Sequence, residues 1–281
     1  MTLRQQLSVA LRYTLNRQGS YLSGFLSRLS ILGIILSISL LIIVLSVMNG
    51  FDREMRENIL ALVPQLTLKS WQPVQDWQQQ IPLIEAAEGV TGAAPFVQVE
   101  AMLVNRTLID TTLVNGIDMQ QEQRLGGVHR LLDADTLRAF DEDSSAVLLG
   151  SELAARLELV AGDQVTLITP SRNGGRADFA YLTVRGLIHT GTEWDQSAAL
   201  IHLQTASELA GLNGAVHGFR VVVKDLFAAG EIGWKLVGEL PGSYYASDWT
   251  MTHGNLYSAI QLSRDLIGML LLSIIAIASF N

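Results

Sequence analysis

The strongest constraint on this chain is an apolar run close to its N-terminus. Residues Leu29–Met48, LSILGIILSISLLIIVLSVM, carry no formal charge. A helix of that length rises about 30 Å, which matches the hydrocarbon thickness of a bilayer. The run is longer than the apolar core of a cleaved signal peptide, and no small-residue cleavage site follows it. The sequence therefore predicts an uncleaved transmembrane helix.

A second apolar run, Leu266–Phe280, stops one residue before the end of the sequence. It is shorter than the roughly twenty residues that a spanning helix needs. We therefore expect a second transmembrane helix that is truncated, in a chain that is the N-terminal fragment of a longer protein. The alternative is an apolar helix that ends a soluble domain.

The distribution of charge predicts the orientation. Residues 1–28 contain four arginines and no acid, whereas all 27 acidic residues lie between Asp52 and Asp265. Short basic flanks of membrane helices stay in the cytoplasm, so the N-terminus is predicted to be cytoplasmic and the large domain periplasmic. The acidic balance of that domain argues against nucleic acid as a partner.

Four segments are expected in chain order. Residues 1–20 form a cytoplasmic amphipathic helix, because their leucines recur on one helical face. Residues 21–50 form transmembrane helix 1, which continues to about residue 63 as a periplasmic helix that Pro64 ends. Residues 64–251 form the periplasmic domain, and residues 252–281 form a helix that leads into the truncated transmembrane helix 2.

The periplasmic domain is predicted to be α+β, with a mainly antiparallel or mixed sheet. Alternating apolar residues indicate many short strands, and several neighbouring strands are too close in sequence for parallel crossover units. Two helix starts are expected from capping residues. Ser151 is predicted to cap the helix Glu152–Leu157, and Thr205 with Glu208 to form a capping box that opens a short helix.

The residues that carry chemistry are sparse. The chain has no cysteine, which excludes thiolate metal sites, thiol nucleophiles and disulfides, and its five histidines lack metal-site spacing. No nucleotide-binding or nucleophile-elbow motif is present. We therefore expect no metal site, no catalytic residue and no enzymatic activity.

One polar, glycine-containing loop between two expected strands is longer than a tight hairpin turn. It is a candidate partner-contact loop, and an ordinary surface loop is the alternative. Its candidate contact residues are Pro170, Arg172, Arg176 and Tyr181.

The segment Leu45–Pro64, LSVMNGFDREMRENILALVP, resembles the signature of the LolC/LolE family, the membrane subunits of the lipoprotein-releasing ABC transporter. Gly116–Asp118 followed by Gln121–Leu125 (QEQRL) is similar to the same family. The segment 148–171, LLGSELAARLELVAGDQVTLITPS, is also similar to this family, although related exporters share its pattern. The resemblance covers essentially the whole chain.

The resemblance implies a bacterial inner-membrane permease subunit with four membrane helices and a periplasmic domain between the first two. ATP is bound by a separate cytoplasmic ATPase subunit, whose contact region would follow this sequence, so no cofactor is expected on this chain. The other implied partners are a second LolC/LolE-type subunit, the lipoprotein substrate, a periplasmic lipoprotein carrier and membrane lipids. By position, the groove for the acyl chains is expected at Leu41, Val44, Met48 and Phe51.

The candidate loop departs from the family pattern, because it looks shortened and Pro170 is its only proline. This places carrier docking through the loop in doubt and, with QEQRL, favours the LolE-like over the LolC-like type. Pairing with a second copy or with a paralogue stays open, as does the identity of the cargo.

Two other functions also stay open. One is a MacB/FtsX-type exporter or mechanotransmission subunit, and the other is a membrane-bound sensor with an extracytoplasmic ligand-binding domain. A sensor predicts a kinase or methyl-accepting region after residue 281, whereas a permease predicts two further apolar runs.

Overall fold

The computed structural model describes residues 65–170 and 177–252 without a break, together with scattered helical residues between positions 25 and 50 and between 254 and 273. The chain divides into two compact units, Met1–Arg53 with Tyr257–Asn281, and Glu54–Leu256. The predicted amphipathic helix 1–20 and the periplasmic extension 51–63 lie outside the described residues.

The first unit is helical wherever it is described, for example at residues 41–47 and 265–270. Among its described residues, no helix is both long enough and apolar enough to cross a membrane. The predicted boundaries of the transmembrane helices therefore stay predictions.

The second unit is built on one nine-stranded sheet with the order β3-β7-β4-β6-β5-β2-β8-β1-β9 and an additional β3–β2 pairing. The β3–β7 and β4–β6 pairs are parallel, and the other pairs are antiparallel. This confirms the predicted mixed sheet with helices. The strands are β1 Leu66–Val74, β2 Val90–Asn105, β3 Leu108–Ile117, β4 Ala146–Gly150, β5 Gln164–Thr169, β6 Asp178–Ile188, β7 Ala199–His202, β8 Val216–Val223 and β9 Tyr244–Asp248.

The strand pairings form a closed circuit with an open extension. Strands β2, β3, β7, β4, β6 and β5 pair in that order and return to β2, whereas β8, β1 and β9 extend from the first half of β2. Strand β2 has 16 residues, and this length lets it belong to both parts. A six-stranded ring and a four-stranded sheet thus share one strand.

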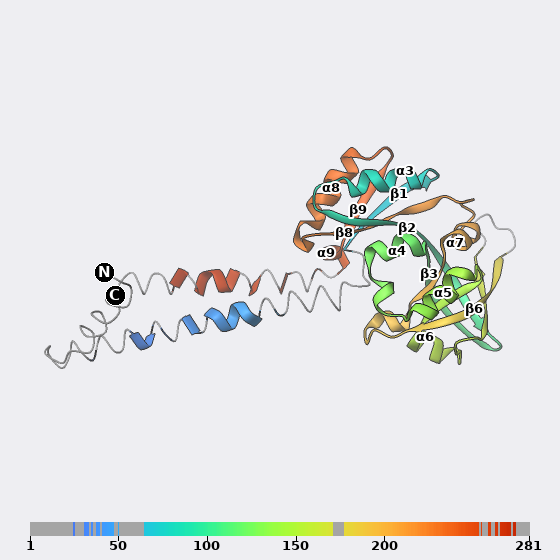
Figure 1. The fold of residues 1–281 in the computed structure, drawn as a ribbon, viewed down its shortest axis with the longest axis horizontal. Coiled ribbons are helices and arrows are strands. Elements are labelled where there is room, and N and C mark those ends of the chain that lie inside the picture. Colours follow the sequence, from blue (N-terminus) through green and yellow to red (C-terminus); the bar gives the residue numbers. More distant parts are fainter. Residues whose placement is uncertain are drawn as a thin grey trace. The chain divides into compact units, whose positions relative to one another are not determined.

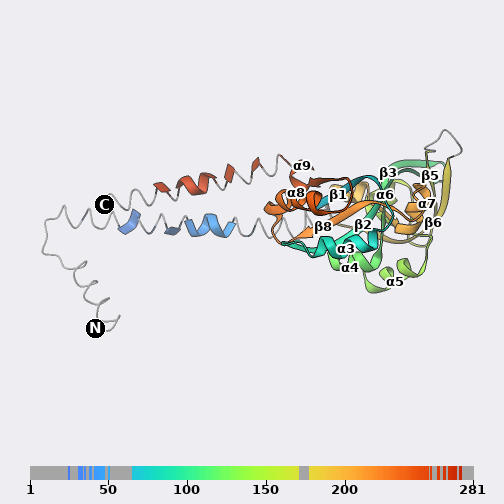
Figure 2. The same ribbon diagram turned by 90° about the horizontal axis from the view of Figure 1, so that it is seen from above.

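Short helices cover the sheet. Figure 1 shows α8 beside β1 and β9, and Figure 2 shows α3, α4 and α5 on one side of this unit. The helices are α3 Trp77–Glu85, α4 Met119–Leu125, α5 Ala134–Glu142, α6 Ser151–Arg156, α7 Leu203–Leu209, α8 Ala229–Glu239 and α9 Trp249–Thr252, and the 3-10 turns are η2 Val128–Arg130, η3 Glu193–Gln196 and η4 Leu226–Ala228.

One core cluster lies between the α4–α5 region and the parallel pair of strands β4 and β6. Phe140 of α5 is fully buried there, and Leu148 of β4 and Ile188 of β6 pack in the same cluster. Burying such side chains contributes about 1.5–3 kcal/mol each relative to exposure. The polar segment between residues 120 and 140 is therefore anchored by a few apolar residues.

Two predicted helix starts are wrong, by one and by three residues. Helix α6 begins at Ser151 itself, and its N-cap is Gly150, because the Ser151 hydroxyl lies 3.1 Å from His189 Nδ1 instead of capping. Helix α7 begins at Leu203, because the Thr205 hydroxyl donates to the carbonyl of Ser144 at 3.1 Å. In both cases a tertiary contact replaces the local cap.

Candidate functional site

The predicted acyl-chain groove falls on the first unit. Leu41 and Val44 are half-buried in the helical stretch 41–47, whereas Ile42 and Ile43 are 60% and 58% exposed. Residues three apart on a helix share a face, so the two candidates lie on the same side of this stretch. The other two candidates, Met48 and Phe51, lie outside the described residues.

The predicted partner-contact loop joins β5 and β6, and Arg172 and Arg176 in it lie outside the described residues. The base of the loop is described. Pro170 is exposed, and Tyr181 is 65% exposed with its ring 5.7 Å from that of Phe179 in an edge-to-face arrangement. Phe179 is 61% exposed and joins Tyr181 at the base of the loop, although the sequence did not mark it as a contact candidate.

These aromatic rings belong to an apolar patch on the outer face of four neighbouring strands. The pairing registers align Thr111, Met102, Ile168 and Phe179 in one row, and Ile109, Val104, Thr166 and Tyr181 in the next. Residues paired across strands point to the same face of a sheet. The patch is scattered over residues 102–181 of the sequence, so only the strand order reveals it.

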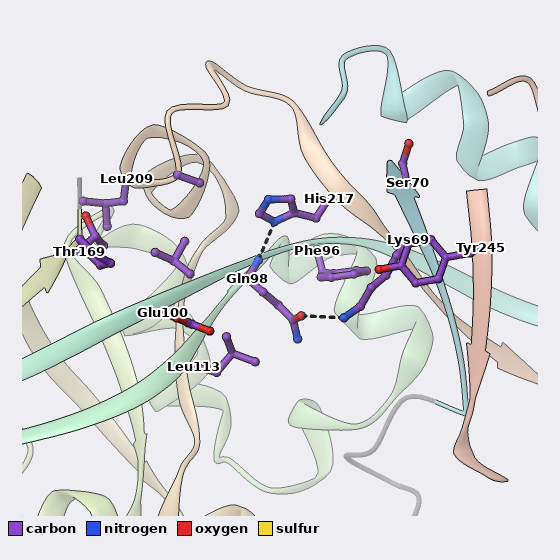
Figure 3. A pocket seen from close by; sticks show the side chains of 13 residues that line it. Lys69, Ser70, Phe96, Gln98, Glu100, Leu113, Thr169, Leu209, His217 and Tyr245 are labelled. Atoms are coloured by element: carbon purple, nitrogen blue, oxygen red, sulfur yellow. Dashed lines mark hydrogen bonds between the residues drawn. The ribbon is translucent and has the colours of Figure 1, made fainter. Parts of the chain in front are cut away.

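A pocket of about 470 Å³ lies where β2 passes from the open sheet into the ring, as Figure 3 shows. Gln98 stands at its centre. Its side chain accepts a hydrogen bond from Lys69 Nζ at 3.3 Å and donates one to Asn115 Oδ1 at 3.0 Å. Its backbone N–H donates to His217 Nδ1 at 3.1 Å, which places the ring proton of neutral His217 on Nε2. The other lining residues include Ser70, Phe96, Glu100, Leu113, Thr169, Pro170, Leu209 and Tyr245.

Comparison with known proteins decides the family. The model of the MacB-like periplasmic core domain matches residues 27–231. The lipoprotein-releasing system transmembrane protein LolC of Xylella fastidiosa (strain 9a5c) is 30% identical over 98% of this chain and 68% of its own length. The chain belongs to the LolC/LolE family.

Both types of the family resemble the chain. LolE of Haemophilus influenzae is 28% identical over 97% of the chain and 68% of the relative. Among solved structures, the periplasmic region of MacB from Actinobacillus actinomycetemcomitans covers 73% of this chain and 98% of its own, at 15% identity and a TM-score of 0.43. The preference for a LolE-like over a LolC-like type stays a prediction.

The structure explains the Lol-like segment around QEQRL. Asp118 caps α4 by accepting from the N–H of Gln121, and Arg124 forms an ion pair with Glu85 of α3 at 3.2 Å. The side chain of Glu122 is 2% exposed and forms an ion pair with Arg220 of β8. Burial lowers the pKa of Arg220 to about 10, so the guanidinium is still charged at neutral pH. The segment thus ties α4 to both α3 and the open sheet.

A serine, a histidine and an aspartate meet near η3 of this Lol-family chain, but they are not arranged for catalysis. Ser151 Oγ and Asp195 Oδ2 both approach the same nitrogen of His189, Nδ1, at 3.1 and 3.2 Å. A catalytic triad needs the base and the orienting acid on opposite ring nitrogens. Asp195 instead accepts hydrogen bonds from Thr190 and Gly191 and so fixes the turn after β6.

The described residues contain no group of three or more histidines and acids that could hold a metal ion. The expected absence of a metal site and of catalysis stays a prediction.

Proposed function

We propose that the chain is the N-terminal part of an inner-membrane permease subunit of an ABC transporter that releases lipoproteins for transfer to the outer membrane. The observation that carries this proposal is the 30% identity to a lipoprotein-releasing system transmembrane protein along nearly the entire chain. The similarity covers both the apolar N-terminal segment and the second unit. It therefore supports the same membrane architecture as LolC, and not merely the presence of a similar domain.

In this proposal the subunit works by movement, without catalysis of its own. A second LolC/LolE-type subunit completes the membrane part, and a separate ATPase binds and hydrolyses ATP. The MacB-like core domain lies in the periplasm, where lipoprotein leaves the membrane for a periplasmic carrier. A MacB/FtsX-type exporter shares that domain, but the identity to LolC and LolE favours lipoprotein release.

The acyl chains of the lipoprotein are proposed to lie against Leu41, Val44, Met48 and Phe51. An apolar groove binds acyl chains through burial worth about 0.8 kcal/mol per methylene. Leu41 and Val44 share a face of the helix and are half-buried, whereas the two isoleucines between them in sequence are exposed. This difference supports a lining role for Leu41 and Val44.

Photo-crosslinking tests the groove in the full-length protein with its partner subunits, in the absence of ATP. A photoreactive residue at position 44, 48 or 51 is expected to crosslink lipoprotein. The same residue at position 43, on the exposed side of the helix, is the matched control and is expected to crosslink phospholipid. Crosslinks to phospholipid alone from all four positions would contradict the groove.

Depletion of the protein in growing cells tests the proposed function itself. We expect outer-membrane lipoproteins to accumulate in the inner membrane, as measured by membrane fractionation and immunoblotting. Normal distribution of every lipoprotein after complete depletion would contradict the proposal.

A further inference from the structure

The hydrogen-bonded ladder along one edge of β2 contains a gap. That edge pairs with β8 from Val90 to Phe96 and with β5 from Met102 to Val104. Phe96 and Met102 each pair with β3 as well, so β3 occupies the opposite edge throughout. Among the described residues, no strand pairs with residues 97–101 on the β5 and β8 edge.

The backbone of Glu100 points into this gap. The N–H of Gln98 is directed at His217 of β8, and residues two apart in a strand direct their backbone groups to the same edge. The N–H and C=O of Glu100 therefore face the gap. No described residue forms a backbone hydrogen bond with either group outside the regular ladders.

Residues at both ends of the gap keep it open. The register that pairs Met102 with Ile168 places Pro170 opposite Glu100, and proline has no N–H to donate to the Glu100 carbonyl. At the other end, pairing between β8 and β2 stops at Gly218, and His217 meets β2 through its side chain.

The gap opens into the pocket of about 470 Å³, with Leu209 and Thr169 on one side and Lys69 and Tyr245 on the other (Figure 3). This volume lies within the range of about 300–1,000 Å³ that is usual for ligand pockets. The five residues of unpaired edge span about 17 Å at 3.4 Å per residue, which suits a few extended residues and is too short for a folded element.

We propose that this gap binds a short extended peptide segment of the lipoprotein cargo as an added strand, an inference that rests on the proposed function. The N–H and C=O of Glu100 complement the C=O and N–H of one residue of an extended chain. Pairing through backbone groups does not depend on the side chains of the bound peptide. It therefore suits a subunit that must accept cargo proteins of different sequence.

Site-specific disulfide crosslinking tests the inference in the complete transporter with its native lipoprotein in the membrane. These 281 residues contain no cysteine, so Leu209→Cys introduces the only thiol in this part of the protein, beside the gap. The probe is a lipoprotein with one cysteine in the unstructured segment that follows its acylated end. The control is Leu83→Cys on α3, which is 53% exposed.

We expect crosslinking from position 209 to exceed that from position 83 by about tenfold, because a bound segment has a local concentration near the millimolar range. Pro170→Ala restores an N–H opposite Glu100 and lets β5 extend its ladder, so it is expected to reduce the crosslink severalfold. Pro82→Ala, at an exposed position in α3, is the matched control and is expected to leave it unchanged.

ATP-dependent release of the same lipoprotein is measured in parallel. Release with equal crosslinking at positions 209 and 83 would overturn the added strand and leave the proposed function intact. Loss of both release and crosslinking would overturn the two together. A crosslink at position 209 that Pro170→Ala does not weaken would refute pairing with the edge of β2.

Discussion

At the residue scale, the stability of the fold depends on a few buried polar contacts that no sequence motif predicts. Glu122 and Arg220 are separated by almost a hundred positions, and their side chains are 2% and 15% exposed. Nε of Arg220 has no hydrogen-bond partner in the described part of the chain. The carboxylate of Glu122 therefore compensates the positive charge of the guanidinium. Removing one member of a buried pair leaves the other charge uncompensated.

Arg220→Ala is expected to lower the free energy of unfolding by about 3–5 kcal/mol. The double variant Arg220→Met with Glu122→Met is expected to recover most of this loss, because apolar residues can replace a buried pair. Arg138→Ala removes the exposed pair with Asp135 and serves as the control with little effect. Denaturant unfolding of the detergent-purified chain measures all three. A double variant as unstable as the single one would contradict the account.

Asp195 gives stability a pH dependence. Burial alone would raise the pKa of its carboxyl group, but hydrogen bonds from Thr190 and Gly191 and the charge of His189 lower it below its ordinary value. The stabilisation is thus fully present above about pH 4, the pKa of an unfolded aspartate, and is lost as pH falls through the lower folded pKa.

Asp195→Asn is expected to cost about 1–3 kcal/mol at pH 7, since it weakens hydrogen bonds to a charged acceptor. Thermal unfolding between pH 3 and pH 7 measures the difference from the natural chain, which should shrink at the acid end. A difference that is constant with pH would show that the charge of Asp195 is unimportant.

At the scale of elements, alternation of apolar residues predicted a mainly antiparallel or mixed sheet of many strands, and the structure confirms a mixed sheet. Alternation could not predict ring closure, since the parallel pairing of Val114 with Ala199 joins strands more than 80 residues apart. The caps at Ser151 and Thr205 were misread because distant partners, His189 and Ser144, engage their hydroxyls.

The groove residues Leu41 and Val44 were expected from the family resemblance, and their lining role stays a prediction. The pocket and the gap beside Glu100 arise from register between β2, β5 and β8, which sequence periodicity does not contain.

Helix α8 offers a matched test of packing at this scale. A Cβ atom on Gly233 would lie 2.7 Å from Leu66 Cδ1 and 2.9 Å from Ala246 Cβ, whereas one on Gly238 would meet nothing within 4 Å. Gly233→Ala is therefore expected to destabilise by about 1–3 kcal/mol, and Gly238→Ala to stabilise by about 0.5–1 kcal/mol. Thermal unfolding separates the two, and equal shifts would contradict the close contact of α8 with β1 and β9.

At the scale of the whole molecule, we propose one task for each unit. The apolar unit is proposed to hold acyl chains at the face of Leu41 and Val44, and the MacB-like unit to bind the polypeptide in the periplasm. In the same proposal, a separate ATPase subunit drives the cycle. The central claim is therefore that this protein, with its partners, couples ATP hydrolysis to lipoprotein release.

The most direct test is release of a labelled lipoprotein from proteoliposomes that contain the full-length protein, its second membrane subunit and its ATPase. With ATP and a soluble lipoprotein carrier, we expect the label to move from the membrane pellet to the supernatant. Val44→Asp, which places a charge in the proposed groove, should abolish this transfer while Ile43→Asp on the exposed side impairs it less. ATP hydrolysis at a normal rate, with all lipoprotein still in the pellet, would contradict the account.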